Sequence, residues 1–300
     1  MDVLSDVLDT VRLTSTVFVR TRLDPPWGIG TPVLSHYAFH IVSGGPSLVE
    51  VDGLAPVDLG DGDVVVIAPG RRHSLRSNAD AQVRDVRDML GDGSLCAAVD
   101  GKSQLVCGSF RLDDPRGGGL ASVLPPLLHV RRDDPDLGPW LAQTVDLLTY
   151  ESFAPRPGQA ALLNRLCDAL FVYLLRGYLS TAPAGEWNWL RALDDPEIGA
   201  ALRLMHGEPY RSWSVPELAT AVGMSRSALA ARFTRLVGEA PIGYLIRWRL
   251  RKAAAMLRDA QGSVEEIAAR VGYDSVGAFS KAFKRAMGVS PGAYRRSVPG

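Results

Sequence analysis

The six residues SVPELA, 214–219, recur 49 positions later as SVEEIA, 263–268, and this repeat decides the fold of the last part of the chain. The dipeptide Val222-Gly223 recurs as Val271-Gly272 at the same offset. One extra residue in the second copy raises the offset to 50 for four further pairs, which are Leu229 with Phe279, Phe233 with Phe283, Gly238 with Gly288 and Pro241 with Pro291. Residues 211–300 therefore hold two tandem copies of one unit.

Each copy begins with Ser-x-x-Glu, in which the Ser side chain accepts a bond from a free amide of the first turn and the Glu reaches back to the cap. A short helix with one apolar face then meets a glycine turn, and a second helix starts directly after that turn. This order is typical of a helix-turn-helix unit, whose second helix enters the major groove of DNA. An ordinary small helical bundle is the alternative interpretation of the same pattern.

The spacing of apolar residues predicts which side of each second helix is exposed. Spacings of i, i+4 and i+7 or i+8 turn one set of side chains inward. In the first copy the inward set is Leu229, Phe233 and Leu236, and the outward set is Arg226, Ser227, Ala230, Ala231 and Thr234. In the second copy the inward set is Phe279, Phe283 and Met287, and the outward set is Val276, Gly277, Ser280, Lys281 and Lys284.

Charge separates this region from the rest of the chain. Residues 211–300 contain 15 Lys and Arg against 6 Asp and Glu, whereas residues 1–210 contain 18 against 27, and the whole chain is neutral. Positive charge gathered on one domain is typical of phosphate binding. Together with the repeat and the turns, this charge favours DNA binding over a plain helical bundle.

Several longer segments resemble the DNA-binding domain of AraC/XylS-type transcription regulators. The matching segments are residues 213–219, 224–227, 241–249, 267–273, 279–284 and 288–295. The resemblance implies a double helix-turn-helix domain that binds double-stranded promoter DNA, with RNA polymerase as a further candidate partner.

Residue types divide the expected DNA contacts into two groups. Base reading is assigned to exposed positions of the second helices, namely Arg226, Ser227, Ala230, Ala231, Val276, Gly277, Ser280 and Lys281. Phosphate contacts are assigned to basic side chains, namely Arg232, Arg235, Arg247, Arg249, Lys284, Arg295 and Arg296. Members of the family often carry larger polar side chains where this chain has Ala231 and Val276-Gly277. We therefore expect specificity to rest on Arg226 and on DNA shape more than is usual.

The amino-terminal part has short apolar runs separated by turn residues. Strands are expected at residues 13–19, 36–42, 48–51, 64–67 and 104–107, and their close spacing indicates a small barrel or jelly roll. Residues 59–73, LGDGDVVVIAPGRRH, are similar to the second conserved motif of cupins. Together with residues 39–42 and 107–110, this run resembles the cupin sensor found at the amino end of some AraC-type regulators.

The resemblance to cupins raises the question of a metal. A cupin metal site resembles a His-x-His pair and a carboxylate on one strand, completed by a His of the second motif. His73 matches that last His, but His36 and His40 are four residues apart, which separates them by more than about ten ångströms along a strand. We expect no metal site and no cofactor, and His36, His40 and His73 are the only metal candidates.

The cysteines suggest a redox hypothesis and a structural one. Cys96 and Cys107 lie eleven residues apart and form a candidate redox pair, but reactivity requires exposure and a lowered thiol pKa. The alternative is that Cys107 and Cys167, which stand in apolar surroundings, are buried small hydrophobic residues.

The pattern becomes helical after residue 120. A short helical piece that ends near Pro125 is expected within residues 120–130, followed by helices over 139–150, 159–179 and 195–206. Residues 159–179 are apolar on most sides, so that helix either packs on the barrel or forms a dimer interface. The resemblance favours the dimer interface.

These observations predict an α+β chain with an amino-terminal cupin-like β-barrel and a carboxy-terminal all-α double helix-turn-helix domain. The expected parts are a cupin-like sensor domain (1–135), a helical dimerisation segment (136–180), a linker (181–193) and the DNA-binding domain (194–300). The sequence shows no signal-peptide pattern and no apolar stretch of membrane-spanning length, so we expect a cytoplasmic homodimer without a membrane partner.

The preferred hypothesis is a sequence-specific transcription regulator that is not an enzyme and responds to a small molecule or a redox signal sensed by the cupin-like domain. The first alternative is a metal-dependent cupin enzyme fused to a DNA-targeting module. The second is a constitutive DNA binder whose barrel only dimerises.

Overall fold

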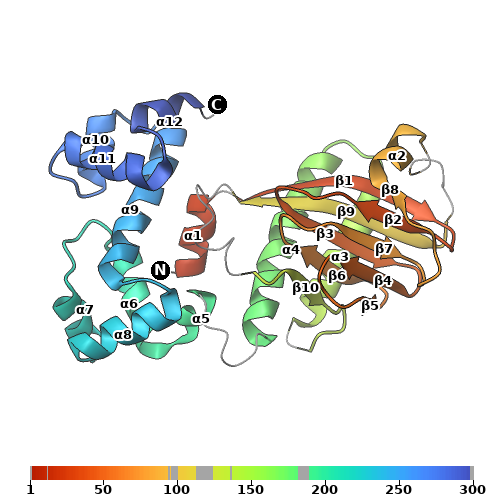
Figure 1. The fold of residues 1–300 in the computed structure, drawn as a ribbon, viewed down its shortest axis with the longest axis horizontal. Coiled ribbons are helices and arrows are strands. Elements are labelled where there is room, and N and C mark those ends of the chain that lie inside the picture. The colour runs from red at the N-terminus through yellow and green to blue at the C-terminus, as the bar shows by residue number, and fades with distance from the viewer. Residues whose placement is uncertain are drawn as a thin grey trace. The chain divides into compact units, whose positions relative to one another are not determined.

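The chain forms two compact units, shown in Figure 1. The computed structural model describes residues 2–11, 13–93, 95, 101–112, 124–135, 137–181 and 189–297. One unit comprises residues 13–112 and 124–182, and the other comprises residues 1–12, 113–123 and 183–300. No helix within the described residues combines the length and the apolar composition that crossing a membrane requires.

The first unit is built on two five-stranded sheets. The antiparallel first sheet has the order β1 (Leu13–Leu23), β9 (Ser103–Leu112), β3 (Tyr37–Ser43), β6 (Asp63–Ile67) and β10 (Leu127–Val130). The second sheet has the order β5 (Val57–Leu59), β4 (Ser47–Val51), β7 (His73–Arg76), β2 (Gly28–Thr31) and β8 (Arg84–Asp85). Apolar side chains of both sheets form one core, which includes Val42 and Leu105 of the first sheet and Val49 and Leu75 of the second.

Three helices complete this unit, namely α2 (Val86–Gly91), α3 (Gly138–Ser152) and α4 (Gln159–Thr181). Helix α4 packs along β1. Its Phe171 lies 4.9 Å from the ring of Phe110, which itself stacks on Phe39 at 4.6 Å. Near the start of β1, the Ser15 hydroxyl donates to the Asp168 carboxylate of α4 at 2.7 Å. The first sheet is therefore covered by apolar side chains on both faces.

Residues 120–123, which make up most of the helical piece expected to end near Pro125, lie outside the described residues. Residues 127–130 form β10, which pairs with β6 from Leu127 opposite Ile67 to Val130 opposite Val64. Leu128 and Val130 are buried while Leu127 and His129 are only partly buried, which is the alternation of a strand. The preceding Pro125-Pro126 pair also favours an extended backbone over a helix.

The second unit is all-helical. Its carboxy-terminal helices are α5 (Trp189–Asp194), α6 (Pro196–Gly207), α7 (Val215–Ala221), α8 (Arg226–Val237), α9 (Pro241–Arg258), α10 (Val264–Arg270), α11 (Val276–Met287) and α12 (Pro291–Ser297). Both predicted capping boxes are confirmed, with Ser214 and Glu217 capping α7 and Ser263 and Glu266 capping α10. The mixed α+β architecture expected from the sequence is confirmed as well.

The second unit also contains the start of the chain. Residues 3–11 form a helix, α1 (Val3–Val11), although the sequence pattern did not predict one. Figure 1 shows α1 beside α9, and its main packing is against α6 and α9. Val3, Val7 and Val11, spaced four residues apart, are all less than 5% exposed. This valine face explains why so short a segment is helical, because tertiary packing supplies what β-branched residues lack in helix propensity.

Candidate nucleic-acid interface

Helices α8 and α11 are the second helices of the two predicted helix-turn-helix units, and the structure builds them alike. Ser225 caps α8 by accepting from the amide of Ala228, and Ser275 caps α11 by accepting from the amide of Ala278. Gly238 and Gly288 end the two helices in the left-handed conformation, each with φ of 84°. Both ends of the repeated unit are therefore fixed by local chemistry.

The predicted base-reading residues lie on α8 and α11, and five of the eight are exposed as expected. The inward residues Leu229, Phe233, Phe279 and Phe283 are fully buried. Of the base-reading candidates, Arg226, Ser227, Ala231, Gly277 and Lys281 are exposed, and Ala230, Val276 and Ser280 are partly buried. Each helix thus presents one polar or small-residue face to solvent.

Helix α9 joins the two units and takes part in both of their cores. Tyr244 and Trp248 in its first half are buried, and the Tyr244 ring meets Phe233 of α8 at 5.8 Å. Leu250 and Leu257 in its second half belong to the core around Phe279 and Phe283. The helix has 18 residues, so it is about 27 Å long. One rigid element therefore determines how far apart α8 and α11 lie.

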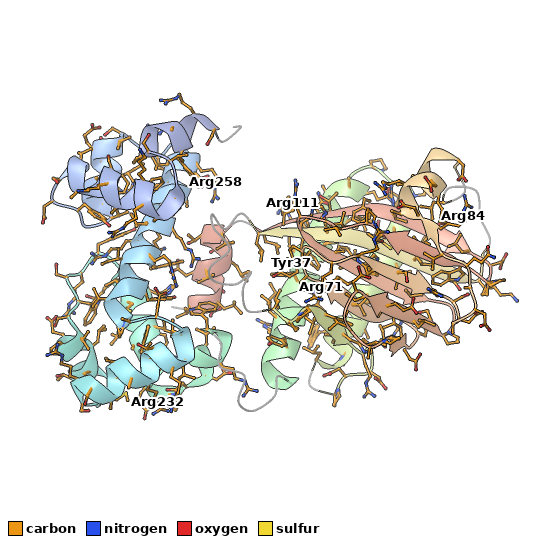
Figure 2. The ribbon with its side chains drawn as sticks, viewed as in Figure 1. Tyr37, Arg71, Arg84, Arg111, Arg232 and Arg258 are labelled. Carbon is orange, nitrogen blue, oxygen red and sulfur yellow. The ribbon has the colours of Figure 1, made fainter. Side chains whose placement is uncertain are left out.

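Four of the predicted phosphate ligands are engaged inside the protein. Arg232, labelled in Figure 2, donates to Asp195 at 2.7 Å and pairs with Glu197 at 3.1 Å. Arg247 pairs with Glu239, Arg249 donates to two backbone carbonyls at 2.6 and 2.7 Å, and Arg295 donates to the carbonyl of Gly262 at 2.6 Å. Each of these arginines therefore holds helices or turns of the protein together, and its role as a phosphate ligand stays a prediction.

The other three phosphate candidates, Arg235, Lys284 and Arg296, have exposed side chains. Lys284 also borders a depression of about 680 Å³ along α11, together with Lys281 and Arg285. Arg285 was not among the sequence-predicted contacts, since only its place beside this depression distinguishes it from other surface arginines. The cluster of basic side chains along α11 therefore contains one residue more, Arg285, than was assigned to DNA contacts from the sequence.

The histidines of the first unit form a pair. Nε2 of His40 on β3 lies 2.8 Å from Nε2 of His73 on β7, and both residues are at most 3% exposed. Burial lowers the pKa of His73 to about 4, partly offset by the Arg71 carbonyl and by Asp52. Burial and the neighbouring His73 hold the pKa of His40 well below its usual value. Both rings are therefore neutral near pH 7, and one donates to the other.

Within the described part of the chain, no third metal-binding side chain joins this pair. His36 is only half-buried, and its pKa is lowered by burial and by Arg111. Among the residues that the structure describes, no group of three His, Cys, Asp or Glu side chains could hold a metal ion. The donor set that the described residues offer therefore does not fit the metal of a cupin enzyme.

Two of the three cysteines, Cys107 and Cys167, are buried and unpaired. Cys96 lies outside the described residues. Cys107 and Cys167 are free and buried, and burial raises the pKa of each thiol to about 12. A thiol in that state is neither exposed nor ionised, so Cys107 and Cys167 behave as small hydrophobic residues.

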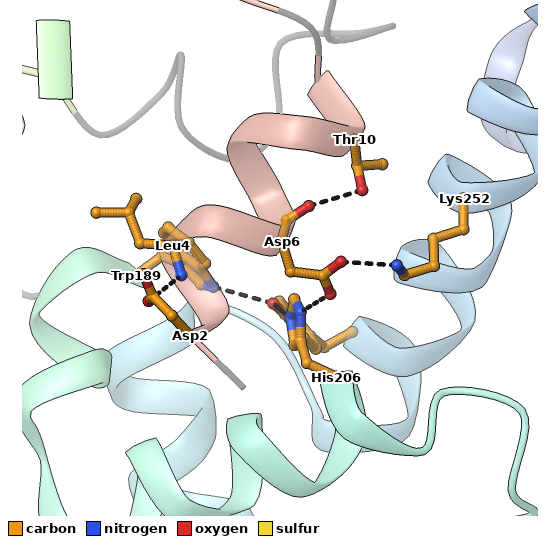
Figure 3. A network of polar contacts seen from close by, with 8 residues as sticks. Asp2, Leu4, Asp6, Thr10, Trp189, His206 and Lys252 are labelled. Atoms are coloured by element: carbon orange, nitrogen blue, oxygen red, sulfur yellow. Dashed lines mark hydrogen bonds and ion pairs between the residues drawn. The ribbon is translucent and has the colours of Figure 1, made fainter. Parts of the chain in front are cut away.

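A buried polar network in the second unit, drawn in Figure 3, was not predicted from the sequence. The Asp6 carboxylate of α1 lies 2.8 Å from Nδ1 of His206 and 2.7 Å from Nζ of Lys252. Nε2 of His206 lies 2.7 Å from Oη of Tyr244, which also accepts a bond from Nε1 of Trp189 at 3.1 Å. His206 is 1% exposed and Asp6 8%.

The pKa shifts of the network follow from these contacts. Burial alone would raise the pKa of Asp6, but the hydrogen bonds from His206 and Lys252 outweigh it and lower the pKa. Burial lowers the pKa of His206, partly offset by Asp6. The network therefore holds an ionised Asp6 beside a neutral His206 and a charged Lys252.

Two protein families match different parts of the chain. A profile described as cupin matches residues 2–180, and one described as a helix-turn-helix domain matches residues 218–297.

Full-length relatives match along nearly the whole chain. An AraC-like transcription regulator of Streptomyces lividans is 34% identical over 99% of this chain and 98% of its own length. The transcriptional regulator AlkR of Acinetobacter baylyi is 29% identical over 99% of both chains. Among solved structures, the DNA-binding domain of AdpA in complex with a target DNA is 34% identical over 34% of this chain and 92% of that one, with a TM-score of 0.33.

Proposed function

Because the chain belongs to the family of AraC-like transcription regulators, we propose that it reads operator DNA with α8 and α11 together and that a signal received by the cupin domain changes this binding. The observation that carries the proposal is the arrangement of two alike, capped helices at the two ends of α9, each with its small or polar face exposed. A rigid connection of about 27 Å suits two helices that enter successive major-groove faces, about 34 Å apart.

Base reading on α8 depends on one long side chain. Arg226 is the first residue of α8 and is exposed, so it can reach base edges and donate two bonds to guanine. Ala230 and Ala231, one turn further on, offer only methyl contacts, which suit the methyl group of thymine. Arg226 is therefore the proposed main source of direct sequence readout on this helix.

The experiment compares Arg226→Ala with wild-type protein on a duplex selected from a random library by the wild type and on a scrambled duplex. We expect affinity for the selected duplex to fall roughly 5- to 150-fold, the equivalent of about 1–3 kcal/mol, with a much smaller loss on the scrambled duplex. Fluorescence anisotropy at fixed salt measures both affinities. Arg235→Ala, on the same helix, is the matched control and should weaken both duplexes alike. Equal losses for Arg226→Ala would refute the assigned role.

We also propose that the chain forms a homodimer through α3. Three large apolar residues on this helix are exposed, with Trp140 at 64%, Leu147 at 42% and Tyr150 at 56%. They are spaced seven and three residues apart, so they lie on one face of the helix. Aromatic residues on an exposed helix face are typical of the centre of a protein interface.

Trp140→Glu should break this dimer, because it places a charge in the apolar contact. We expect the dimer dissociation constant to rise at least roughly 30-fold, the equivalent of about 2 kcal/mol. Sedimentation equilibrium over a range of protein concentrations measures it. Val33→Glu, at an apolar residue that is 58% exposed elsewhere in the same unit, should leave the dimer unchanged. A dimer that survives Trp140→Glu would contradict the proposed interface.

For the signal, we propose a small molecule over oxidation of Cys107, because that thiol is buried and protonated. The cupin unit offers a depression of about 530 Å³ whose lining includes Glu50, Asp85, Arg72 and Arg76. Side chains of both charges suit a small polar molecule better than an apolar one.

The remaining parts of the proposal follow the family. The chain is proposed to act in the cytoplasm as a regulator without catalytic activity and to contact RNA polymerase once it is bound at a promoter. Its proposed parts are a sensor domain (1–135), a dimerisation segment (136–180), a linker (181–193) and a DNA-binding domain (194–300), with α1 packed on the last of these.

A further inference from the structure

We infer that Asp6, at the start of the chain, is a positioning residue for DNA binding: through it, α1 holds α9 and so fixes the distance between the two reading helices. This inference rests on the proposed use of both α8 and α11. It concerns a segment far in sequence from the helix-turn-helix repeat, since Asp6 lies 200 residues from His206 and 246 from Lys252.

Two kinds of contact hold helix α1 in place, apolar packing by its valines and hydrogen bonds to Asp6. Its valine face is buried, and Asp6 is the only acidic residue of α1 that is buried, since Asp9 is exposed. A carboxylate that is 8% exposed costs several kcal/mol to desolvate unless it is paired and hydrogen-bonded. Asp6 meets that requirement with one bond to each of two different helices, α6 through His206 and α9 through Lys252.

The chemistry of the groups determines the direction of every bond. An ionised carboxylate only accepts, so Nδ1 of His206 carries the proton and donates to Asp6. Nε2 of the neutral ring then accepts from the Tyr244 hydroxyl, whose oxygen accepts from the Trp189 indole. Two members of the chain of bonds, His206 through Nδ1 and Lys252 through Nζ, depend directly on Asp6. Without α1, the buried Nδ1–H of His206 loses its acceptor and Lys252 loses its counter-ion.

The contacts on α9 are spread along its length. Tyr244 lies in its first half, Lys252 in its second, and Arg258 at its end donates to the backbone carbonyl of Thr10 on α1 at 3.3 Å. Helix α1 is thus bonded directly to α9 at Lys252 and Arg258, and it is linked to Tyr244 only through His206 of α6. A helix of 18 residues that is held directly at two points, and through His206 at a third, resists bending between the two DNA-reading units.

These contacts indicate that α1 stabilises the DNA-binding arrangement and does not cover the DNA-reading helices. The main packing of α1 is against α6 and α9, which form the framework of the unit. Arg226 of α8 and Lys281 of α11 are exposed in the same structure. Docked α1 therefore leaves the base-reading side chains accessible, and its removal should weaken DNA binding and not strengthen it.

The test uses full-length protein and two duplexes, one selected by the wild type that carries both half-sites and one in which the α11 half-site is scrambled. Wild-type protein should prefer the first duplex. Asp6→Asn should reduce this preference about ten-fold, because two helix-turn-helix units at a wrong distance can no longer contact both half-sites at the same time. Asp9→Asn, on the same helix, should keep the wild-type preference. The ratio of the two affinities is the decisive readout, since a loss of active protein lowers both affinities equally.

A second variant tests the same contact from the other side, in case Asp6→Asn misfolds. Lys252→Gln removes the contact of α9 to Asp6 while leaving the Asp6–His206 bond in place, and it should reduce the preference in the same direction. An unchanged ratio in both variants, or tighter binding of Asp6→Asn to the two-half-site duplex, would overturn the inference. A wild-type protein that showed no preference between the duplexes would instead refute the proposed joint use of α8 and α11.

Discussion

Replacing Phe283 with alanine should unfold the α11 half of the DNA-binding unit and abolish binding to any duplex that requires both halves. Phe283 is fully buried, and its ring lies 5.5 Å from the rings of Phe279 and Tyr294. Truncating a buried Phe to Ala costs about 3–5 kcal/mol, because the transfer free energy is lost and a cavity is left behind. The core around it is small, with ten buried residues, and four of those are alanine or valine. A loss of this size is a large part of the stability of such a domain.

Thermal unfolding followed by circular dichroism, together with DNA binding, measures this effect. Met287→Ala is the matched control, because Met287 packs at the edge of the same core and is only partly buried. It should cost far less and leave binding detectable. Phe233→Ala, at the equivalent buried position of α8, should be as damaging as Phe283→Ala. A Phe283→Ala protein that unfolds at the wild-type temperature would show that Phe283 does not stabilise the core around α11.

The features predicted correctly are those whose causes lie within a few residues. Both capping boxes form from local bonds. In each pair, Ser214 with Glu217 and Ser263 with Glu266, each side chain accepts a hydrogen bond from the backbone amide of the other residue, without help from the rest of the fold. The inward faces of α8 and α11 follow from 3.6-residue periodicity. Local chemistry and repetition together were therefore sufficient for the architecture of the DNA-binding unit.

The features missed depend on partners that are far apart in sequence. Residues 3–11 are rich in valine and short for a helix, and only packing on α6 and α9 makes them helical. Arg232 has a basic side chain that suits a phosphate ligand. Its partner in the structure is Asp195, which lies 37 residues away in the sequence. The pairs Asp6–His206 and His40–His73 are separated by 200 and 33 residues. A single amino-acid sequence, taken by itself, contains no signal that joins such residues.

The His40–His73 contact should make the stability of the cupin unit fall as the solution becomes acidic. The pKa of His73 is about 4 in the fold against 6.5 for the free group, so the unfolded chain binds more protons between these values. Stability is therefore complete above pH 6.5 and is lost as the pH falls toward 4. His73 alone contributes a loss of about 2 kcal/mol by pH 5 and roughly 3 kcal/mol by pH 4. His40 acts in the same direction, because its pKa is also lowered.

Urea unfolding of the cupin unit at pH 7.5, 6 and 5 measures the slope. The double variant His40→Leu/His73→Leu removes both titrating rings and both partners of the bond, so it leaves neither ring unpaired and should flatten most of this slope. His36→Gln is the control, because His36 is only half-buried and lies outside the pair. Proton NMR of the wild type adds a direct readout, since neither paired ring should become protonated above pH 5. Protonation of both rings near pH 6.5, or an unchanged slope in the double variant, would show that the pair is not held neutral by burial.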